Sequence, residues 1–125
     1  MPHVYRASCH CGRVKLTFAK PAPVDRLIDC NCTICTKKGV LHTPVLEDEV
    51  TSLEGADDLA LYRFGSGVAE HRFCRHCGIH VYGRPRSAPE RLTVNARCLD
   101  NFAEVLATAE RIVFDGQNHP KDLVG

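Results

Sequence analysis

Seven of the eight cysteines of this chain fall into three tight groups. The first group is Cys9-His10-Cys11-Gly12, and the third is Cys74-Arg75-His76-Cys77-Gly78. The second group places three cysteines within six residues: Cys30, Cys32 and Cys35. Spacings of one or two residues aim several sulfurs at one point, which favours metal binding.

Disulfide bonds are the alternative use of so many cysteines, and they need an oxidising compartment. The first residues, Met1 to Arg6, carry no apolar core of a signal peptide. No apolar run approaches the ~18 residues of a membrane span. We therefore expect a cytoplasmic protein that binds metal, and we disfavour a secreted disulfide scaffold.

Glycine distinguishes the three groups. Gly12 and Gly78 directly follow the last cysteine of the first and third groups. A turn that aims two thiolates and its own amides at one ion often needs positive φ there, which glycine supplies. Together the two turns offer four thiolates, and four thiolates make a closed, tetrahedral, structural zinc site. The predicted ligands of this zinc are Cys9, Cys11, Cys74 and Cys77.

The second group has no glycine directly after Cys35. Its three cysteines predict a second zinc with one open position, which is the arrangement of a catalytic zinc. The alternative is a second structural site that Cys98 or a histidine completes. Cys98 stands alone and is typical of a small buried apolar residue. Three histidines lie in strand-like stretches and are possible neighbours of this zinc, without a choice among them: His42, His71 and His80.

The composition indicates one globular domain over residues 1–125, with 25% charged and 44% hydrophobic residues. The formal net charge is +1, and the basic residues are scattered. Filling both zinc sites would bring the charge to about −2, counting seven thiolates and two zinc ions. Neither nucleic acid nor an anionic membrane is an expected partner of such a surface. The oligomeric state is not predicted.

Short strands with turn residues between them make the expected fold mainly β. One helical turn is predicted before Gly39, over Thr33–Lys38, and a solvated turn at Glu47–Glu49. Residues 101–110 have mixed character and receive no assignment. No βαβ pattern is present, which disfavours a doubly wound parallel sheet. The predicted strands are Arg13–Phe18, Val24–Cys30, Val40–Val45, Leu59–Phe64, Ala69–Phe73, Ile79–Tyr82, Arg91–Ala96 and Ile112–Phe114.

These motifs resemble the glutathione-dependent formaldehyde-activating enzyme family, whose centromere protein V relatives share the pattern. The resemblance rests on C-x-C-G at Cys9, C-x-C-x-x-C at Cys30, and F-C-x-x-C-G-x-H from Phe73 to His80. It extends to Asn95–Asp100 and to Phe114-Asp115-Gly116. It implies a β-tent (Mss4-like) fold of small antiparallel sheets around two zinc sites. It also implies the same seven cysteine ligands, with Cys30, Cys32 and Cys35 at the catalytic zinc.

The activity that the resemblance implies is the reversible addition of glutathione, or another thiol, to formaldehyde or a small aldehyde. Its reverse is carbon–sulfur lyase chemistry. Glutathione carries two carboxylates, so we expect cations near the second zinc. Lys37 and Lys38 follow Cys35 closely, and Arg63, Arg84 and Arg86 are further possibilities. The alternative function is a non-catalytic protein-binding module that zinc stabilises.

Overall fold

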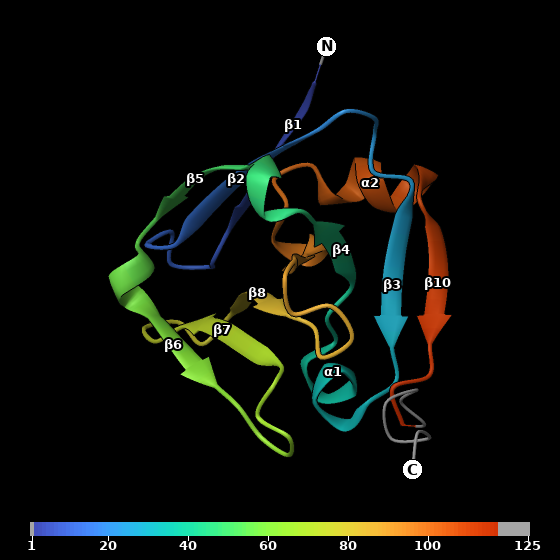
Figure 1. Cartoon of the computed structure of the whole chain (residues 1–125). Coiled ribbons are helices and arrows are strands. Elements are labelled where there is room, and N and C mark those ends of the chain that lie inside the picture. The colour runs from blue at the N-terminus through green and yellow to red at the C-terminus, as the bar shows by residue number, and fades with distance from the viewer. Residues whose placement is uncertain (1, 118–125) are drawn as a thin grey trace.

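The computed structural model describes residues 2–117, so residue 1 and residues 118–125 of the expected domain lie outside it. Strands dominate the described part, and they form two sheets (Figure 1). The smaller sheet has the order β1-β2-β5 and is antiparallel throughout. Its strands are β1 (His3–Ser8), β2 (Lys15–Lys20) and β5 (Val50–Glu54).

The larger sheet has seven strands in the order β10-β3-β4-β9-β8-β7-β6. Two short α-helices and three 3-10 turns connect the strands: α1 (Thr33–Lys38), α2 (Phe102–Thr108), η1 (Glu47–Glu49), η2 (Ala56–Asp58) and η3 (Ala96–Cys98). None of the helices described is long and apolar enough to cross a membrane. The strands are β3 (Arg26–Cys30), β4 (His42–Val45), β6 (Leu59–Tyr62), β7 (Glu70–Cys74), β8 (His80–Arg84), β9 (Leu92–Asn95) and β10 (Glu110–Phe114).

The mainly β architecture expected from the sequence is confirmed, with one difference in strand direction. β3 and β10 pair in parallel, from Arg26 beside Glu110 to Cys30 beside Phe114, whereas the other strand pairs within residues 2–117 are antiparallel. Figure 1 shows the two strands side by side at one edge of the molecule. The unassigned residues 101–110 explain the difference, because they contain α2, which returns the chain to the start of β3. The end of β10 therefore lies beside the end of β3, where the second cysteine group begins.

The predicted solvated turn at Glu47–Glu49 is a 3-10 turn, in which Glu47 and Asp48 are exposed as predicted and Glu49 is not. The Glu49 side chain is only 13% exposed and forms an ion pair with Lys20 at 2.8 Å. Its carboxylate also accepts a hydrogen bond from the Leu46 amide at 2.8 Å. A run of acidic residues does not reveal a lysine that lies nearly thirty positions earlier in the chain.

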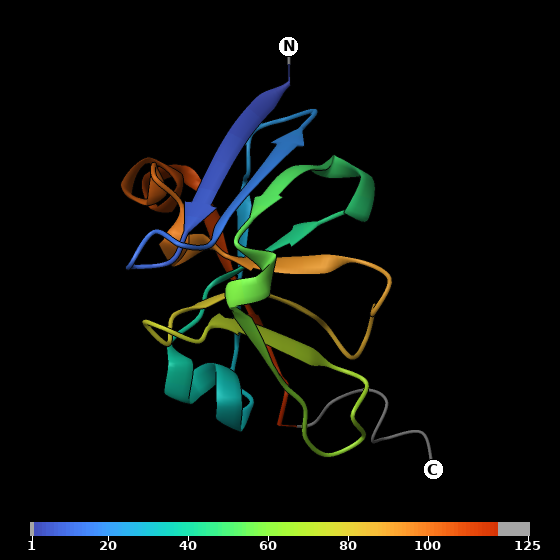
Figure 2. The same ribbon diagram turned by 90° about the vertical axis from the view of Figure 1, so that its left-hand side faces the viewer.

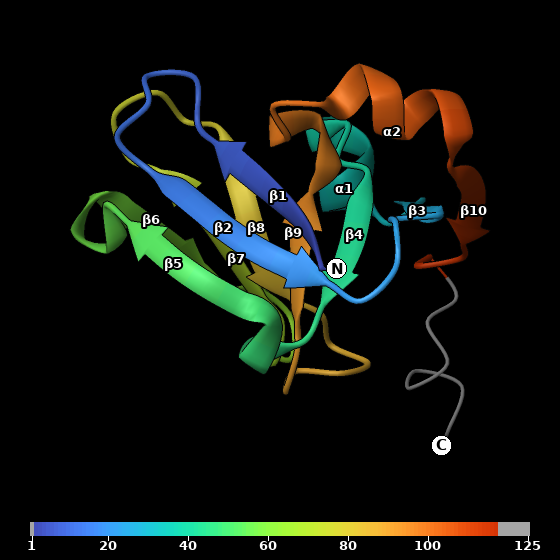
Figure 3. The same cartoon turned by 90° about the horizontal axis from the view of Figure 1, so that it is seen from above.

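The hydrophobic core lies between the two sheets. Figures 2 and 3 show the arrangement of these sheets from the side and from above. β2 alternates as predicted, with Leu16 and Phe18 fully buried. Tyr5 of β1 stacks on Phe18 at 5.3 Å between ring centroids. Burying each such side chain contributes roughly 1.5–3 kcal/mol. The core thus holds the smaller sheet, with the first cysteine group after β1, against the larger sheet, which carries the other two groups.

Candidate metal centres and a pocket beside one of them

The first and third cysteine groups meet, as the sequence predicts. The sulfurs of Cys9, Cys11, Cys74 and Cys77, here called the knuckle cluster, all lie within 4.8 Å of one another. Cys11 Sγ lies 3.6 Å from Cys9 Sγ and 3.6 Å from Cys74 Sγ, well beyond a disulfide bond. Four sulfurs at ~2.3 Å from a tetrahedral ion would lie about 3.8 Å apart. The knuckle cluster therefore has the spacing of a four-thiolate metal site.

Glycine closes both turns of the knuckle cluster. Gly12 has φ 82° and Gly78 has φ 79°, in the left-handed region. The Gly12 amide donates to the Cys9 carbonyl at 3.2 Å, and the Gly78 amide donates to the Cys74 carbonyl at 2.8 Å. The Val14 amide donates to Cys9 Sγ at 3.3 Å. These bonds fix the direction of the sulfurs before any ion binds.

At the exposed edge of the knuckle cluster, neighbouring groups favour the thiolate form of Cys11 over its thiol form. The backbone and side chain of Arg13 hydrogen-bond Cys11 and lower its pKa to about 6. His76, inside the third group, does not face a sulfur, because its Nε2 lies 2.7 Å from Asp58 Oδ1. That contact ties the Cys74–Cys77 turn to η2.

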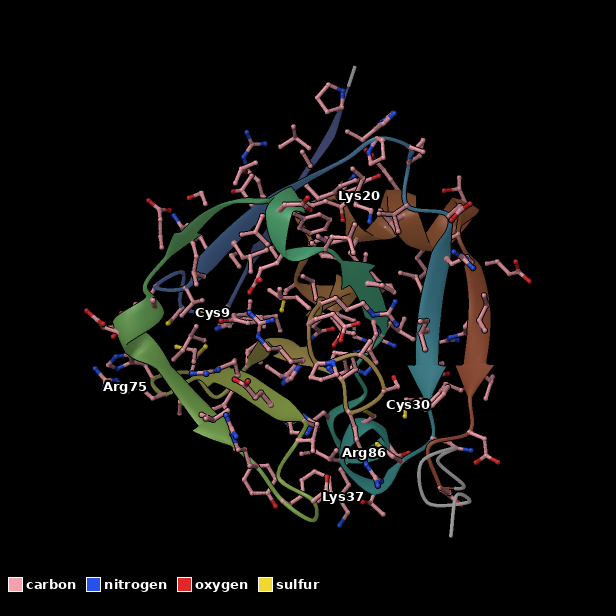
Figure 4. All side chains as sticks on the ribbon, viewed as in Figure 1. Cys9, Lys20, Cys30, Lys37, Arg75 and Arg86 are labelled. Carbon is pink, nitrogen blue, oxygen red and sulfur yellow. The ribbon has the colours of Figure 1, made fainter. Side chains whose placement is uncertain are left out.

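The second group forms a separate cluster of three sulfurs. The sulfurs of Cys30, Cys32 and Cys35, here called the pocket cluster, lie within 4.8 Å of one another. Cys30 ends β3, Cys32 is the N-cap of α1, and Cys35 lies in its first turn. Figure 4 shows Cys30 well apart from Cys9 of the knuckle cluster. One short connection between strand and helix therefore supplies the whole pocket cluster.

The three thiols of the pocket cluster are crowded. A hydrogen bond from Cys35 lowers the pKa of Cys30 to about 6, and the same bond, with burial, raises the pKa of Cys35. Gly116 packs directly on the cluster, where a Cβ would lie 2.6 Å from Cys30 Sγ and 2.8 Å from Cys32 Cβ. Thiolates packed this closely need a cation to ionise together, and a metal ion would supply it.

Neither residue that the sequence offered as a fourth ligand belongs to the pocket cluster. Cys98 Sγ donates to the His80 carbonyl at 3.4 Å instead. His42 Nε2 lies 3.2 Å from Cys35 Sγ, yet no histidine is part of the three-sulfur group. Within residues 2–117 the pocket cluster thus offers three ligand atoms, and His42 supports one of them.

The pocket cluster lies in the wall of a cavity of about 880 Å³, here called the pocket. This volume is within the usual range of small-molecule sites. Phe64, Gly65 and Ser66, from the connection between β6 and β7, form part of the wall. Its polar lining includes Glu70 and also three histidines and three arginines: His42, His71, His80, Arg84, Arg86 and Arg91. The knuckle cluster contributes no residue to the described lining.

The sequence could not choose among the three histidines, and all three line the pocket. Burial is the main cause that lowers their pKa values, to about 4 for His42, to about 3 for His80, and by a smaller shift for His71. Each has one buried ring nitrogen without a hydrogen-bond partner in the described structure: His42 Nδ1, His71 Nε2 and His80 Nε2. The pocket therefore presents neutral imidazoles that retain bonding capacity.

Of the cations predicted near the second zinc, Arg84 and Arg86 line the pocket. Lys37 and Lys38 are not among its described lining residues, and Lys38 Nζ lies 3.1 Å from His80 Nδ1. Arg63 lies 3.6 Å from Glu70 in an ion pair. Helix α1 runs away from the cluster after Cys35, which explains why nearness in sequence does not bring either lysine into the pocket.

Arg91 is a pocket residue that the sequence analysis missed. It directly precedes β9, and its buried Nε has no hydrogen-bond partner among the described atoms. The only signal in the sequence was its position at the start of a strand, next to the Ser87-Ala88-Pro89 break. Arg84, by comparison, already binds Glu47 Oε1 at 2.5 Å and the Pro89 carbonyl at 3.3 Å.

Fold and site together define a small, mainly β protein with two cysteine clusters that could hold metal ions, one of them beside a pocket. The family model described as glutathione-dependent formaldehyde-activating enzyme matches residues 4–115. The chain belongs to this family. It is also similar to the crystal structure of a Rhodobacter sphaeroides protein from structural genomics, with 28% identity and a TM-score of 0.71. That match covers 96% of this chain and 95% of the other.

Proposed function

We propose that this protein catalyses the reversible addition of glutathione, or a similar small thiol, to formaldehyde or another small aldehyde. The observation that carries the proposal is the position of the pocket cluster. Three sulfurs without a fourth share one wall of an 880 Å³ pocket with three arginines. Membership of the family supports the choice of thiol and aldehyde. The reverse reaction breaks a carbon–sulfur bond, so the protein would be a carbon–sulfur lyase.

Both clusters fit zinc, so we propose two zinc ions per chain. Four thiolates at the knuckle cluster suit a closed structural site, and three at the pocket cluster suit a site with an exchangeable position. Zinc at the pocket cluster would supply thiol deprotonation at neutral pH and Lewis acidity. Cys30, Cys32 and Cys35 would hold it, and His42 would orient Cys35 through the 3.2 Å contact.

The arginines are the groups we assign to the carboxylates of glutathione. A guanidinium binds a carboxylate through two parallel hydrogen bonds, which fixes the thiol relative to the sulfurs opposite. Arg91 is the best placed, because its Nε is buried in the lining and has no described partner. Each such contact would contribute about 1.5–3 kcal/mol. Lys37 and Lys38 remain predicted contacts of a glutathione carboxylate. Because neither lysine is among the described lining residues, the thiol would have to extend beyond that lining to reach them.

The reaction is an addition of the thiol to the carbonyl group of the aldehyde. The thiol sulfur forms a bond to the carbonyl carbon, the π pair moves to oxygen, and the proton lost by the thiol reaches that oxygen through water. Ile28 and Phe64 give the pocket apolar walls, which limit competing water. A reducing cytoplasm would supply glutathione and keep all eight cysteines free.

A non-catalytic, zinc-stabilised protein-binding module is the second possible function, and one feature favours it. Large apolar side chains are exposed around the connection between β6 and β7, where Tyr62 is 47% and Phe64 is 45% exposed. Their rings stack at 5.7 Å between centroids. Phe64 also lines the pocket, so a partner protein bound to this aromatic pair would cover part of the pocket.

The test is a rate measurement, because the uncatalysed addition also reaches equilibrium. Exchange spectroscopy should show that zinc-loaded protein speeds exchange between free formaldehyde and its glutathione adduct. Cys32→Ala should remove this acceleration and one of two zinc ions while the chain stays folded. Cys98→Ala, at a cysteine outside both clusters, should keep both ions. If the unaltered, zinc-loaded protein gives only the background rate, the enzymatic proposal is wrong and the binding module takes its place.

A further inference from the structure

The contact between Lys38 and His80 has no part in the function proposed above. Lys38 Nζ lies 3.1 Å from His80 Nδ1 and 5.6 Å from the centre of the Phe73 ring. Burial lowers the pKa of Lys38, whereas the nearby Cys35 raises it and the face of the Phe73 ring attracts an ammonium. His80 itself is only 5% exposed. The contact therefore joins the end of α1 to the first residue of β8 behind the pocket wall.

This contact fixes the tautomer of His80. An ammonium has three hydrogens to donate and no lone pair to accept, so His80 Nδ1 must accept. A neutral imidazole with an unprotonated Nδ1 carries its hydrogen on Nε2. Burial, followed by the charge of Lys38, lowers the pKa of His80 to about 3, so the ring stays neutral near pH 7. Beside a charged Lys38, His80 thus presents an Nε2–H donor.

The donor has no use inside the protein. His80 Nε2 is buried and lacks a hydrogen-bond partner among residues 2–117, although buried N–H groups are almost always bonded. His80 lines the pocket together with the pocket cluster and His42, which contacts Cys35 Sγ at 3.2 Å. A ligand with an oxygen acceptor would satisfy the Nε2–H.

The other two histidines lack this arrangement. His42 Nε2 is engaged by Cys35 Sγ, so only its Nδ1 remains available. His71 stacks on Phe64 at 5.6 Å and lies tilted against His80 at 6.1 Å between centroids, and no cation fixes its tautomer in the described contacts. His80 alone combines a fixed donor with a place in the lining.

We propose that His80 is a catalytic residue that donates its Nε2–H hydrogen bond to the aldehyde oxygen as the thiol adds, and that Lys38 is the positioning residue that sets this donor. The proposal rests on the proposed function. As the carbon–sulfur bond forms and the π pair moves to oxygen, negative charge grows on that oxygen. A preorganised donor binds this charge more tightly than the uncharged carbonyl. His80 keeps its hydrogen, and the proton for the oxygen comes from water.

The first experiment reads the tautomer without any activity. Long-range ¹H–¹⁵N spectra of the zinc-loaded full chain should show His80 as a neutral ring, protonated at Nε2 and unprotonated at Nδ1. Lys38→Met should shift His80 toward a mixture of tautomers, whereas Lys15→Met, at an exposed lysine of β2, should leave it unchanged. Protonation at Nδ1 in the unaltered protein would overturn the proposal.

The second experiment measures exchange between formaldehyde and its glutathione adduct. Removing one such donor typically lowers kcat by about 10²–10³. His80→Ala should show this loss with little change in the KM for glutathione, and His80→Gln should recover part of the rate. Lys38→Met should lower kcat less than His80→Ala does. His3→Ala, at an exposed histidine, serves as control, and zinc content and thermal unfolding show whether each variant is folded.

The two proposals fail in different ways. If the unaltered protein is active and folded His80→Ala keeps full kcat, the role of His80 is wrong and the proposed function stands. If the unaltered protein is inactive, the proposed function fails, and the catalytic role of His80 fails with it. Reduced kcat in folded His80→Ala, together with the Nε2–H tautomer, supports both proposals.

Discussion

The two cysteine clusters use the same ligand type and differ in what surrounds them. The knuckle cluster draws its four sulfurs from two turns, and Cys11 and Cys74 lie 63 positions apart in the chain. The pocket cluster draws its three sulfurs from one strand–helix connection and lies in the wall of the pocket. Metal in the first closes a long loop of chain, whereas metal in the second faces a space that a ligand can enter. One cluster is therefore suited to stability, and the other to chemistry.

The largest effect should follow from removing a ligand of the knuckle cluster. Cys74 is fully buried, and its cluster joins the end of β1 to the end of β7. In a structural zinc site the binding free energy is folding free energy. Cys74→Ser should therefore cost about 5 kcal/mol or more, comparable with the whole stability of a domain.

The matched variant for Cys74→Ser is Cys32→Ser, which removes one sulfur from the pocket cluster instead. It should leave the thermal midpoint much closer to that of the unaltered protein. The measurement is the melting curve and the metal content of both variants. Equal loss of stability in the two variants would contradict the division into a structural and a reactive cluster.

The two clusters should also differ in the rate at which they lose metal to a chelator. A chelator should take metal in two phases, because the pocket cluster has three ligands beside an open cavity and the knuckle cluster has four. The fast phase should disappear in Cys32→Ala, and added glutathione should change the fast phase only. An absorbing chelator in a stopped-flow instrument records both phases. A single phase for two ions would mean that the clusters exchange metal alike.

Sequence reasoning worked best where the residues of one feature are close in the chain. The helical turn at Thr33–Lys38 has its predicted bounds, because Gly39 ends it with φ 67°. The glycines at 12 and 78 have the positive φ that the turns require. The two strands β1 and β5 were missed, since their place in a sheet depends on pairing with β2 rather than on their own patterns.

The pocket was less predictable than the cysteine clusters. Its lining combines residues from the end of β3, α1, the connection between β6 and β7, β8 and β9. Lys38 stood near Cys35 in sequence, and the turn of α1 directs it to His80 instead of into the lining. The only local signal of Arg91 was its position at the start of a strand, and it did not point to the pocket, because the pairing of β9 with β8 and β4 brings Arg91 there.

Arg91 allows a test of the pocket that leaves both clusters intact. Its buried Nε has no partner in the described structure, so Arg91→Met should cost the fold little. Losing a charge-assisted contact of about 1.5–3 kcal/mol should raise the KM for glutathione roughly 10- to 100-fold, with a smaller change in kcat. Arg26→Met, at an exposed arginine on β3, is the control. Cysteamine has no carboxylate, so its KM should not change. An equal loss with both thiols would show that Arg91 shapes the pocket instead of binding a carboxylate.

The smallest effects should come from a pair of glycines, one at each cluster. A Cβ at Gly12 meets no atom within 4 Å, yet its φ of 82° strains any other residue, so Gly12→Ala should cost about 1–2 kcal/mol of stability. A Cβ at Gly116 would meet Cys30 Sγ at 2.6 Å, with no such demand on φ. Gly116→Ala should therefore weaken metal binding at the pocket cluster and change the melting temperature little. Metal titration and thermal unfolding of both variants compare their metal affinity and their stability. If Gly116→Ala lowers stability as much as Gly12→Ala does and binds metal normally, the pocket cluster contributes to folding in the same way as the knuckle cluster.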